Sequence, residues 1–178
     1  MGPSAPPVLC VLLRALVRAR STGVIIAIAA DHAGRPLVDT VADVVRSLGH
    51  EALLVGPAGG DSSESPRADD YPDIARAVGT AVVDGRAERG IALCGSGAGV
   101  SVAATKMRGV RAAVAHDHYT AHQMVEHDAM NVLAIGARVI GSEVAAEIVA
   151  AFVGATFSGE ARHVRRLDKV MAMEAAGR

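Results

Sequence analysis

Residues 24–55, VIIAIAADHAGRPLVDTVADVVRSLGHEALLV, contain the pattern of a strand, a helix and a second strand. The run VIIAIAA is continuously apolar, which is typical of a parallel strand buried on both faces. Over residues 36–48 the apolar side chains recur at helical spacing, with a proline at the start and Gly49 just past the end. Residues 51–55 predict the second strand. Parallel strands joined by a helix indicate a right-handed crossover and an α/β sheet.

The same alternation continues to the end of the chain. A polar loop rich in Gly, Ser and Pro covers residues 56–70. Further strands are predicted at 90–94, 111–115 and 131–135, and helices at 72–84, from GSGAG to about residue 107, between the fourth and fifth strands, at 144–153 and at 162–176. No linker divides this pattern. We therefore expect one α/β domain over residues 24–178, with a five-stranded parallel sheet between two helical layers, and an N-terminal extension over residues 1–23.

Composition restricts the function. The 178 residues carry 18 basic and 19 acidic side chains, so the net charge of −1 gives no general attraction to nucleic acid or to an anionic membrane. Aromatic residues are 2% of the chain, which argues against a base-stacking surface. No apolar run is long enough to cross a bilayer. Two cysteines fit a reducing compartment, and we expect a cytoplasmic protein.

The first 30 residues contain no acidic side chain, and a short apolar run at residues 8–13 is followed by arginines. A secretory signal has its positive charge before the apolar run, so export is not predicted. An organellar transit peptide, a loosely ordered extension and an upstream start codon all remain compatible with this composition.

Functional residue types gather where the predicted strands end. These stretches are Asp31-His32-Ala33-Gly34, Cys94-Gly95-Ser96-Gly97-Ala98-Gly99, His116-Asp117-His118 and Gly136-Ala137-Arg138. In parallel sheets, ligands bind outside the carboxyl ends of the strands. A site is therefore expected at this edge.

The segment LCGSGAGVS runs from a strand through glycines into a helix. Its G-x-G-x-G spacing and its place after the third strand do not fit a dinucleotide fingerprint. A cradle of backbone N–H groups for an anion or oxyanion and a simple tight turn are the two remaining interpretations. Cys94 lies at its mouth, where a thiol can act as base or nucleophile; the alternative is a small core residue.

Histidines and arginines provide two further clusters. His118 and His122 lie four apart, but neither H-E-x-x-H nor a nearby second cysteine supports a zinc site. An acid–base role for His127, before the fifth strand, is the better interpretation. The segment ARHVRR places Arg162 and Arg166 on one helical face, which suits a phosphate or a solvated basic helix end equally well.

Together these stretches resemble the ribose-5-phosphate isomerase B family, which also contains the galactose-6-phosphate isomerase subunits. The resemblance is carried, in the family's order, by IAADHAG (28–34), DYPDIA (70–75), GIALCGSGAGVSVAATKMRGVRAAV (90–114), EHDAMNVLAIGARVIG (126–141) and ARHVRRLDKV (161–170). It covers nearly all of the chain from residue 24 onward and implies a three-layer αβα Rossmann-like fold. It also implies a homodimer or a dimer of dimers with sites shared between subunits, and aldose–ketose isomerisation of a sugar phosphate through a cis-enediolate, without metal or cofactor.

The resemblance also implies individual roles. Cys94 matches the base that moves a proton between C1 and C2, and His127 matches the group that assists ring opening. The other matches are contacts to substrate: Asp31 and His32, the enediolate loop Gly95, Ser96, Gly97, Ala98 and Gly99, and the phosphate clamp Arg138, Arg162 and Arg166. One branch of the family uses a glutamate base instead; here Val100 occupies that neighbourhood, which favours the cysteine branch.

Three positions depart from the family pattern. Asp128 follows the histidine where many members have Asn, Glu160-Ala161 replaces Gly-Gly, and the loop at 56–70 is longer. Asp128 still accepts hydrogen bonds from sugar hydroxyls. Ribose 5-phosphate is the expected substrate, with a tetrose 4-phosphate or a hexose 6-phosphate as alternatives. A non-catalytic sensor of a sugar phosphate or nucleotide and a metal hydrolase built on the histidines are rivals from other classes.

Overall fold

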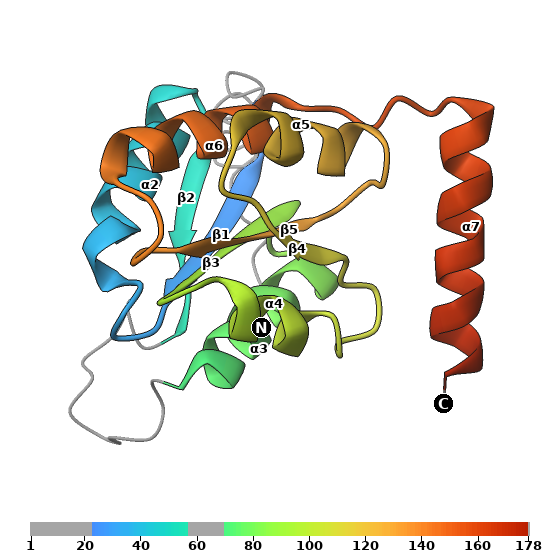
Figure 1. Cartoon of the computed structure of the whole chain (residues 1–178), viewed down its shortest axis with the longest axis horizontal. Helices are drawn as coiled ribbons and strands as arrows, with labels where there is room; N and C mark the ends of the chain where they lie inside the picture. The colour runs from blue at the N-terminus through green and yellow to red at the C-terminus, as the bar shows by residue number, and fades with distance from the viewer. Residues whose placement is uncertain (1–22, 57–69, 178) are drawn as a thin grey trace, which may run out of the picture.

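The computed structural model describes residues 23–56 and 70–177. In them, five parallel strands form one sheet between two layers of helices (Figure 1). The strands are β1 (Ile25–Ala30), β2 (Glu51–Leu54), β3 (Arg89–Cys94), β4 (Ala112–Val114) and β5 (Val132–Gly136). The predicted αβα Rossmann-like fold is confirmed. Most of the predicted extension, including Cys10, and most of the loop at 56–70 lie outside the described residues.

Helices follow the predicted segments with small differences at their ends. They are η1 (Arg35–Leu37), α2 (Val38–Ser47), α3 (Tyr71–Val83), α4 (Ala98–Ala104), α5 (His118–Glu126), α6 (Ser142–Gly154) and α7 (Ala161–Ala176). The helix predicted from residue 36 begins instead as a single 3-10 turn, η1, which contains Pro36. Proline has no N–H to donate, so it suits this first turn.

The strand order is β2-β1-β3-β5-β4, so the last strand of the chain is inserted between β3 and β4. From β1 the chain moves outward to β2 and then returns to the other side of β1 as β3. This reversal leaves a crevice outside the carboxyl ends of β1 and β3, where ligands bind in open α/β sheets. Asp31 follows β1 and Cys94 ends β3, so both lie at the crevice.

Two apolar layers hold the sheet. Helices α2, α5 and α6 cover one face and α3 and α4 cover the other (Figure 1). Phe152 of α6 is fully buried in the first layer, and Ile74 and Val78 of α3 are fully buried in the second. Completely burying such a side chain contributes about 1.5–3 kcal/mol. None of the helices in the described ranges has the length and apolar character needed to cross a membrane.

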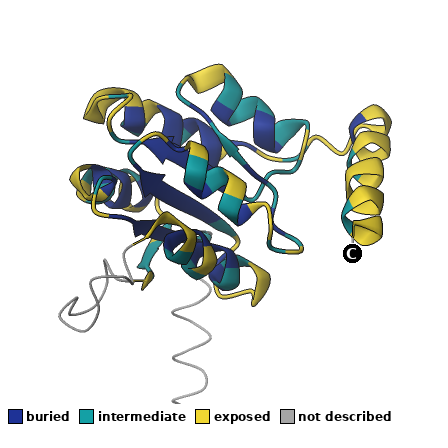
Figure 2. Ribbon diagram, turned by 60° about the horizontal axis from the view of Figure 1, so that its bottom comes forward, coloured by how far each residue is buried: buried dark blue, intermediate teal, exposed yellow. Residues whose placement is uncertain are grey.

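Helix α7 stands apart from these layers. It is exposed along most of its length (Figure 2), and His163 is its only buried residue. The side chains of Val170, Met171 and Met173 are exposed although they are apolar. At its far end, the Glu174 carboxylate accepts a hydrogen bond from Gly109 N–H at 2.7 Å. The helix therefore touches the body of the chain at its two ends and leaves an apolar surface uncovered.

Candidate active site

A cavity of about 430 Å³ opens at the crevice between β1 and β3. It gathers side chains and backbone from four separate stretches of the chain. Its lining residues are Asp31, His32, Ala33, Tyr71, Cys94, Gly95, Ser96, Gly99, Arg138 and Val139. Most of the predicted site residues at the carboxyl edge are thus brought together, with Gly97 and Ala98 adjacent in the same loop.

Asp31 is buried and organises the turn after β1. Its Oδ1 accepts hydrogen bonds from Ala33 N–H at 2.9 Å and from Gly34 N–H at 2.8 Å. A Cβ on Gly34 would lie 2.4 Å from the carbonyl oxygen of Leu93, so only glycine permits this close approach to β3. The Asp31 carboxylate therefore fixes a turn that presents the exposed His32 at the cavity.

The loop between β3 and α4 forms the floor of the cavity. Gly97 has a φ of +82°, in the left-handed region that favours glycine, and its N–H donates to Cys94 Sγ at 3.1 Å. The buried thiol of Cys94 is therefore held by its own loop. Among the described residues, the N–H groups of Ser96 and Gly99 make no hydrogen bond. They remain available to an oxyanion in the cavity.

The turn after β5 is joined to this loop by backbone hydrogen bonds. Ala137 N–H donates to the Cys94 carbonyl at 2.9 Å and Arg138 N–H to the Gly95 carbonyl at 3.0 Å. His116, after β4, supports the turn because its Nε2 accepts from Gly136 N–H at 3.1 Å. The backbone of Arg138 is consequently fixed beside the Cys94 loop, and its exposed side chain lines the cavity.

Tyr71 is a lining residue that the sequence analysis did not single out. It begins α3, and a Cβ on Gly99 would lie 3.2 Å from its ring, so the ring packs directly on the loop. Its place in the matched stretch DYPDIA, in a chain with only two tyrosines, was the available signal.

A second group of predicted residues lies elsewhere. His127, Asp128, Arg162 and Arg166 do not line the cavity. His127 ends α5 and precedes β5, at the amino edge of the sheet, while Cys94 pairs in register with Gly136 at the carboxyl end of β5. The five residues of β5 span about 16 Å at 3.3 Å per residue. One chain therefore does not bring His127 to Cys94.

The two arginines of α7 are exposed. Arg162 Nε lies 2.9 Å from Glu160 Oε2, one of the residues that departs from the family pattern. Arg166 follows one turn later on the same helix. Asp128 is also exposed, and it directly follows His127 in the sequence.

The histidines of α5 form a row on the protein surface. The rings of His118 and His122 stack with centroids 6.4 Å apart, and His122 Nε2 lies 3.6 Å from Glu126 Oε2. Within residues 23–56 and 70–177, no group of three or more His, Cys, Asp or Glu side chains is arranged to hold a metal ion.

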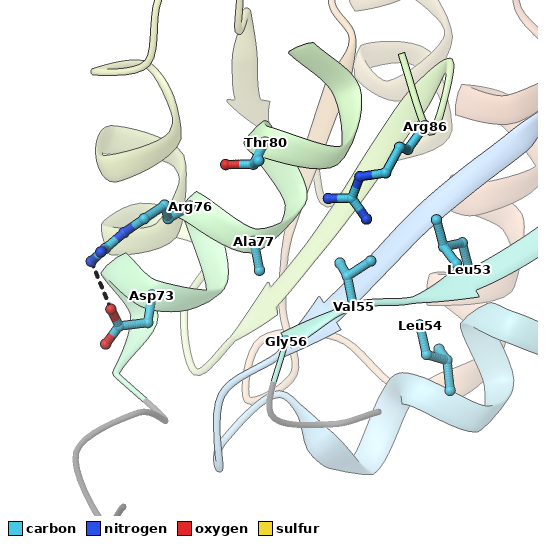
Figure 3. Close-up of a pocket in the computed structure, with 9 residues that line it drawn as sticks. All are labelled: Leu53, Leu54, Val55, Gly56, Asp73, Arg76, Ala77, Thr80 and Arg86. Atoms are coloured by element: carbon cyan, nitrogen blue, oxygen red, sulfur yellow. Dashed lines mark hydrogen bonds and ion pairs between the residues drawn. The ribbon is translucent and has the colours of Figure 1, made fainter. Parts of the chain in front are cut away.

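A second cavity, of about 490 Å³, lies between the carboxyl end of β2 and α3. Figure 3 shows Arg86 directed into it, while Arg76 is paired with Asp73 at 2.7 Å. Its described lining contains neither cysteine nor histidine, so it offers no thiol and no imidazole for acid–base chemistry near neutral pH. The cavity at Cys94 is therefore the candidate active site.

Comparison with known proteins adds an independent observation. The family model described as Ribose/Galactose Isomerase matches residues 26–170. The chain belongs to this family. As a member of the Ribose/Galactose Isomerase family it is an isomerase.

Three relatives illustrate the range of the family. Ribose-5-phosphate isomerase B of Escherichia coli (strain K12) is 40% identical over 149 residues, 84% of this chain and 95% of that protein. D-erythrulose-4-phosphate isomerase of Pectobacterium atrosepticum is 40% identical over 116 residues, 64% of this chain and 72% of that protein. The structure of type B ribose 5-phosphate isomerase from Trypanosoma brucei matches with a TM-score of 0.77 and 40% identity, covering 85% of this chain and 99% of that one.

Proposed function

We propose that this family member interconverts an aldose phosphate and a ketose phosphate, with ribose 5-phosphate and ribulose 5-phosphate as substrate and product. The observation that supports this most strongly is the buried thiol of Cys94 in a cavity with unused backbone N–H groups and the cation of Arg138. The reaction needs a base for a carbon-bound proton, donors for the resulting oxyanion and a positive group for the phosphate.

Each part of the cavity has a task in this proposal. The Cys94 thiolate removes the proton from C2 of the open-chain aldose, giving a cis-enediolate, and returns the proton to C1 while the hydroxyl proton of O2 passes to O1. The N–H groups of Ser96 and Gly99 stabilise the negative oxygen, a contribution of about 3–4 kcal/mol for each donor in comparable sites. Arg138 binds the phosphate and holds the reacting carbons in place. Asp31 and His32 contact the sugar hydroxyls.

His127 and the α7 arginines complete the site from a second copy of the chain. His127 is far from Cys94 within one chain, and Arg162 and Arg166 do not line its cavity, which supports an arrangement in which they serve the substrate across an interface. The exposed Val170, Met171 and Met173 of α7 supply apolar surface for such an interface. We propose a homodimer, or a dimer of dimers, in which two-fold symmetry makes two such sites. His127 then assists ring opening, and Arg162, Arg166 and Asp128 contact the substrate.

The decisive assay measures conversion of ribose 5-phosphate in EDTA by the wild type and by Cys94→Ser. The variant should keep substrate binding and lose at least ~10²-fold in kcat, the contribution of a positioned acid–base group. A non-catalytic sensor predicts binding without turnover by the wild type. A metal hydrolase predicts loss of activity in EDTA.

Mixing two variants that are impaired in conversion tests the shared site. Cys94→Ser and His127→Ala are unfolded and refolded together. Random pairing then makes half of the dimers mixed, and each mixed dimer has one intact site, so activity should return to about one quarter of the wild type. No recovery, with mixed dimers demonstrated by a tag on one variant, would place both residues of a working site in one chain.

A tetrose phosphate is the second candidate substrate, because one relative is named D-erythrulose-4-phosphate isomerase. Asp128 adds a negative charge at a proposed substrate contact. Comparing kcat/KM for four-, five- and six-carbon aldose phosphates separates these options, and a negligible rate with ribose 5-phosphate would exclude our choice. We propose the cytoplasm as the compartment, consistent with the free thiol of Cys94.

A further inference from the structure

The proposed mechanism leaves one buried titratable side chain without a task. Within the described part of the chain, the buried polar or charged residues are Asp31 and His163, and Asp31 belongs to the cavity. His163 is 1% exposed, on a helix whose other residues are exposed or partly exposed. Burying an imidazole is unfavourable unless its nitrogens find partners, so its contacts point to a role.

His163 packs directly on His127. The ring centroids are 4.1 Å apart and the rings are inclined by 33°. The Nδ1 of His163 lies 2.7 Å from Ser158 Oγ, and Ser158 N–H donates to the Glu126 carbonyl at 2.9 Å. Ser158 thus ties His163 to the end of α5, the helix on which His127 is the C-cap. His127 is held on one ring face by a side chain that is itself fixed.

The surroundings of the two histidines determine the charge on His163 and the charge next to His127. Burial lowers the pKa of His163, and the positive charges of His127, Arg162 and Arg166 lower it further, while Glu160 opposes them. His163 is therefore neutral at pH 7. On the other side, Glu126 Oε2 lies 3.7 Å from His127 Nε2 and 3.6 Å from His122 Nε2. A protonated His127 ring therefore has the neutral ring of His163 on one face and the Glu126 carboxylate near its Nε2.

We propose that His163, held by Ser158, is a positioning residue that fixes the His127 ring for its proton transfer to the substrate. This rests on the proposed function, in which His127 opens the sugar ring. Ring opening and enolisation are separable steps. Loss of His163 should therefore impair the step that His127 serves and spare the proton transfer by Cys94.

The chemistry of the two sugars provides the readout. Ribose 5-phosphate is mainly a five-membered ring and must open before its C2 proton is accessible. Ribulose 5-phosphate cannot close such a ring, because its C5 oxygen carries the phosphate. In D2O the Cys94 thiolate can take the C1 proton of ribulose 5-phosphate to give the enediolate and return a deuteron to C1. This exchange needs no ring opening.

The experiment compares both reactions at saturating sugar phosphate for the wild type, His163→Ala, His127→Ala and the double variant. We expect His163→Ala to lower kcat for ribose 5-phosphate by about 10-fold or more, and exchange into ribulose 5-phosphate to change by less than about 2-fold. The double variant should be no slower than His127→Ala alone, because both changes affect one function. Equal losses in conversion and exchange, or additive losses in the double variant, would overturn the proposal.

Two further variants keep the test informative. If His163→Ala does not fold, Ser158→Ala removes only the hydroxyl that binds Nδ1 and should show the same split between conversion and exchange. Ser47→Ala is its matched control, since the exposed Ser47 Oγ of α2 binds only a carbonyl of its own helix. Cys94→Ser must abolish both reactions. If exchange survives in that variant, the proposed function fails, whatever the result for His163.

Discussion

The two edges of the sheet carry the two halves of the proposed site, and they are held together differently. At the carboxyl edge the turns after β3 and β5 are joined to each other by backbone hydrogen bonds, as from Ala137 N–H to the Cys94 carbonyl, and Asp31 and His116 brace single turns. At the amino edge a side chain makes the long-range contact. The Arg89 guanidinium there binds three carbonyls at the end of α6, those of Phe152, Val153 and Ala155.

This difference determines which changes each edge tolerates. Where one backbone segment packs directly on another, as at Gly34 and Gly136, an added Cβ would collide with backbone atoms. Where side chains make the contacts, one substitution leaves several buried polar groups unpaired. The carboxyl edge should therefore be sensitive to added volume, and the amino edge to lost hydrogen bonds.

The largest effect is expected for Gly136→Ala at the carboxyl edge. The new Cβ would lie 2.5 Å from the backbone carbon of Ser96, so the turn and the cavity loop must move apart. A displacement of about 1 Å at the reacting groups costs on the order of 10²-fold in kcat. Gly154→Ala is the control, because a Cβ there meets nothing within 4 Å. Equal activity of both variants would contradict the backbone-held description.

At the amino edge, Arg89→Leu should lower stability rather than activity. It leaves three carbonyls unpaired and removes the cation 5.5 Å above the centre of the Phe152 ring. We expect the free energy of unfolding to fall by about 2 kcal/mol, since hydrogen bonds to charged groups contribute about 1.5–3 kcal/mol. Urea denaturation measures this, with Arg46→Leu, which breaks an exposed pair with Asp43, as the control near zero. Similar losses in both variants would show that the carbonyl contacts contribute little.

The same contrast explains what the sequence predicts. Continuous apolar runs such as VIIAIAA and the glycines after β3 are local patterns, and they identified the strands and the cavity loop correctly. Backbone-built features leave such signatures because glycine and helix-capping preferences act on neighbouring residues.

Contacts between distant side chains leave no such signature. Insertion of β5 between β3 and β4 depends on pairing across the whole domain, and the strand order was not predicted. The packing of His163 on His127 and the place of Tyr71 over Gly99 likewise depend on how separate elements meet. His127 precedes one parallel strand and Cys94 ends another, so strand polarity places them at opposite edges, while their separation depends on the register of β3 with β5.

Measuring the free energy of unfolding as a function of pH tests the burial of His163 at the amino edge. The pKa of His163 is lowered in the folded chain, so below about pH 6.5 the unfolded chain binds more protons and the free energy of unfolding falls as the pH falls. His163→Gln removes this contribution. From pH 7 to pH 5 the free energy of unfolding should therefore fall more for the wild type than for His163→Gln. His118→Gln, at an exposed histidine, is the matched control, and parallel curves for wild type and His163→Gln would contradict the assignment.

The smallest effect is expected at Glu160, whose carboxylate pairs with Arg162 and so competes with the substrate phosphate for that cation. The ion pair between Glu160 and Arg162 is more than half exposed, and such pairs contribute about 0.2–1 kcal/mol. Glu160→Gln frees Arg162 for the substrate phosphate, so KM should fall by up to about 5-fold while kcat stays the same. Asp43→Asn breaks a comparable pair with Arg46, far from the α7 arginines, and should leave KM unchanged. If KM is also unchanged in Glu160→Gln, Arg162 does not bind phosphate, and the clamp is limited to Arg138 and Arg166.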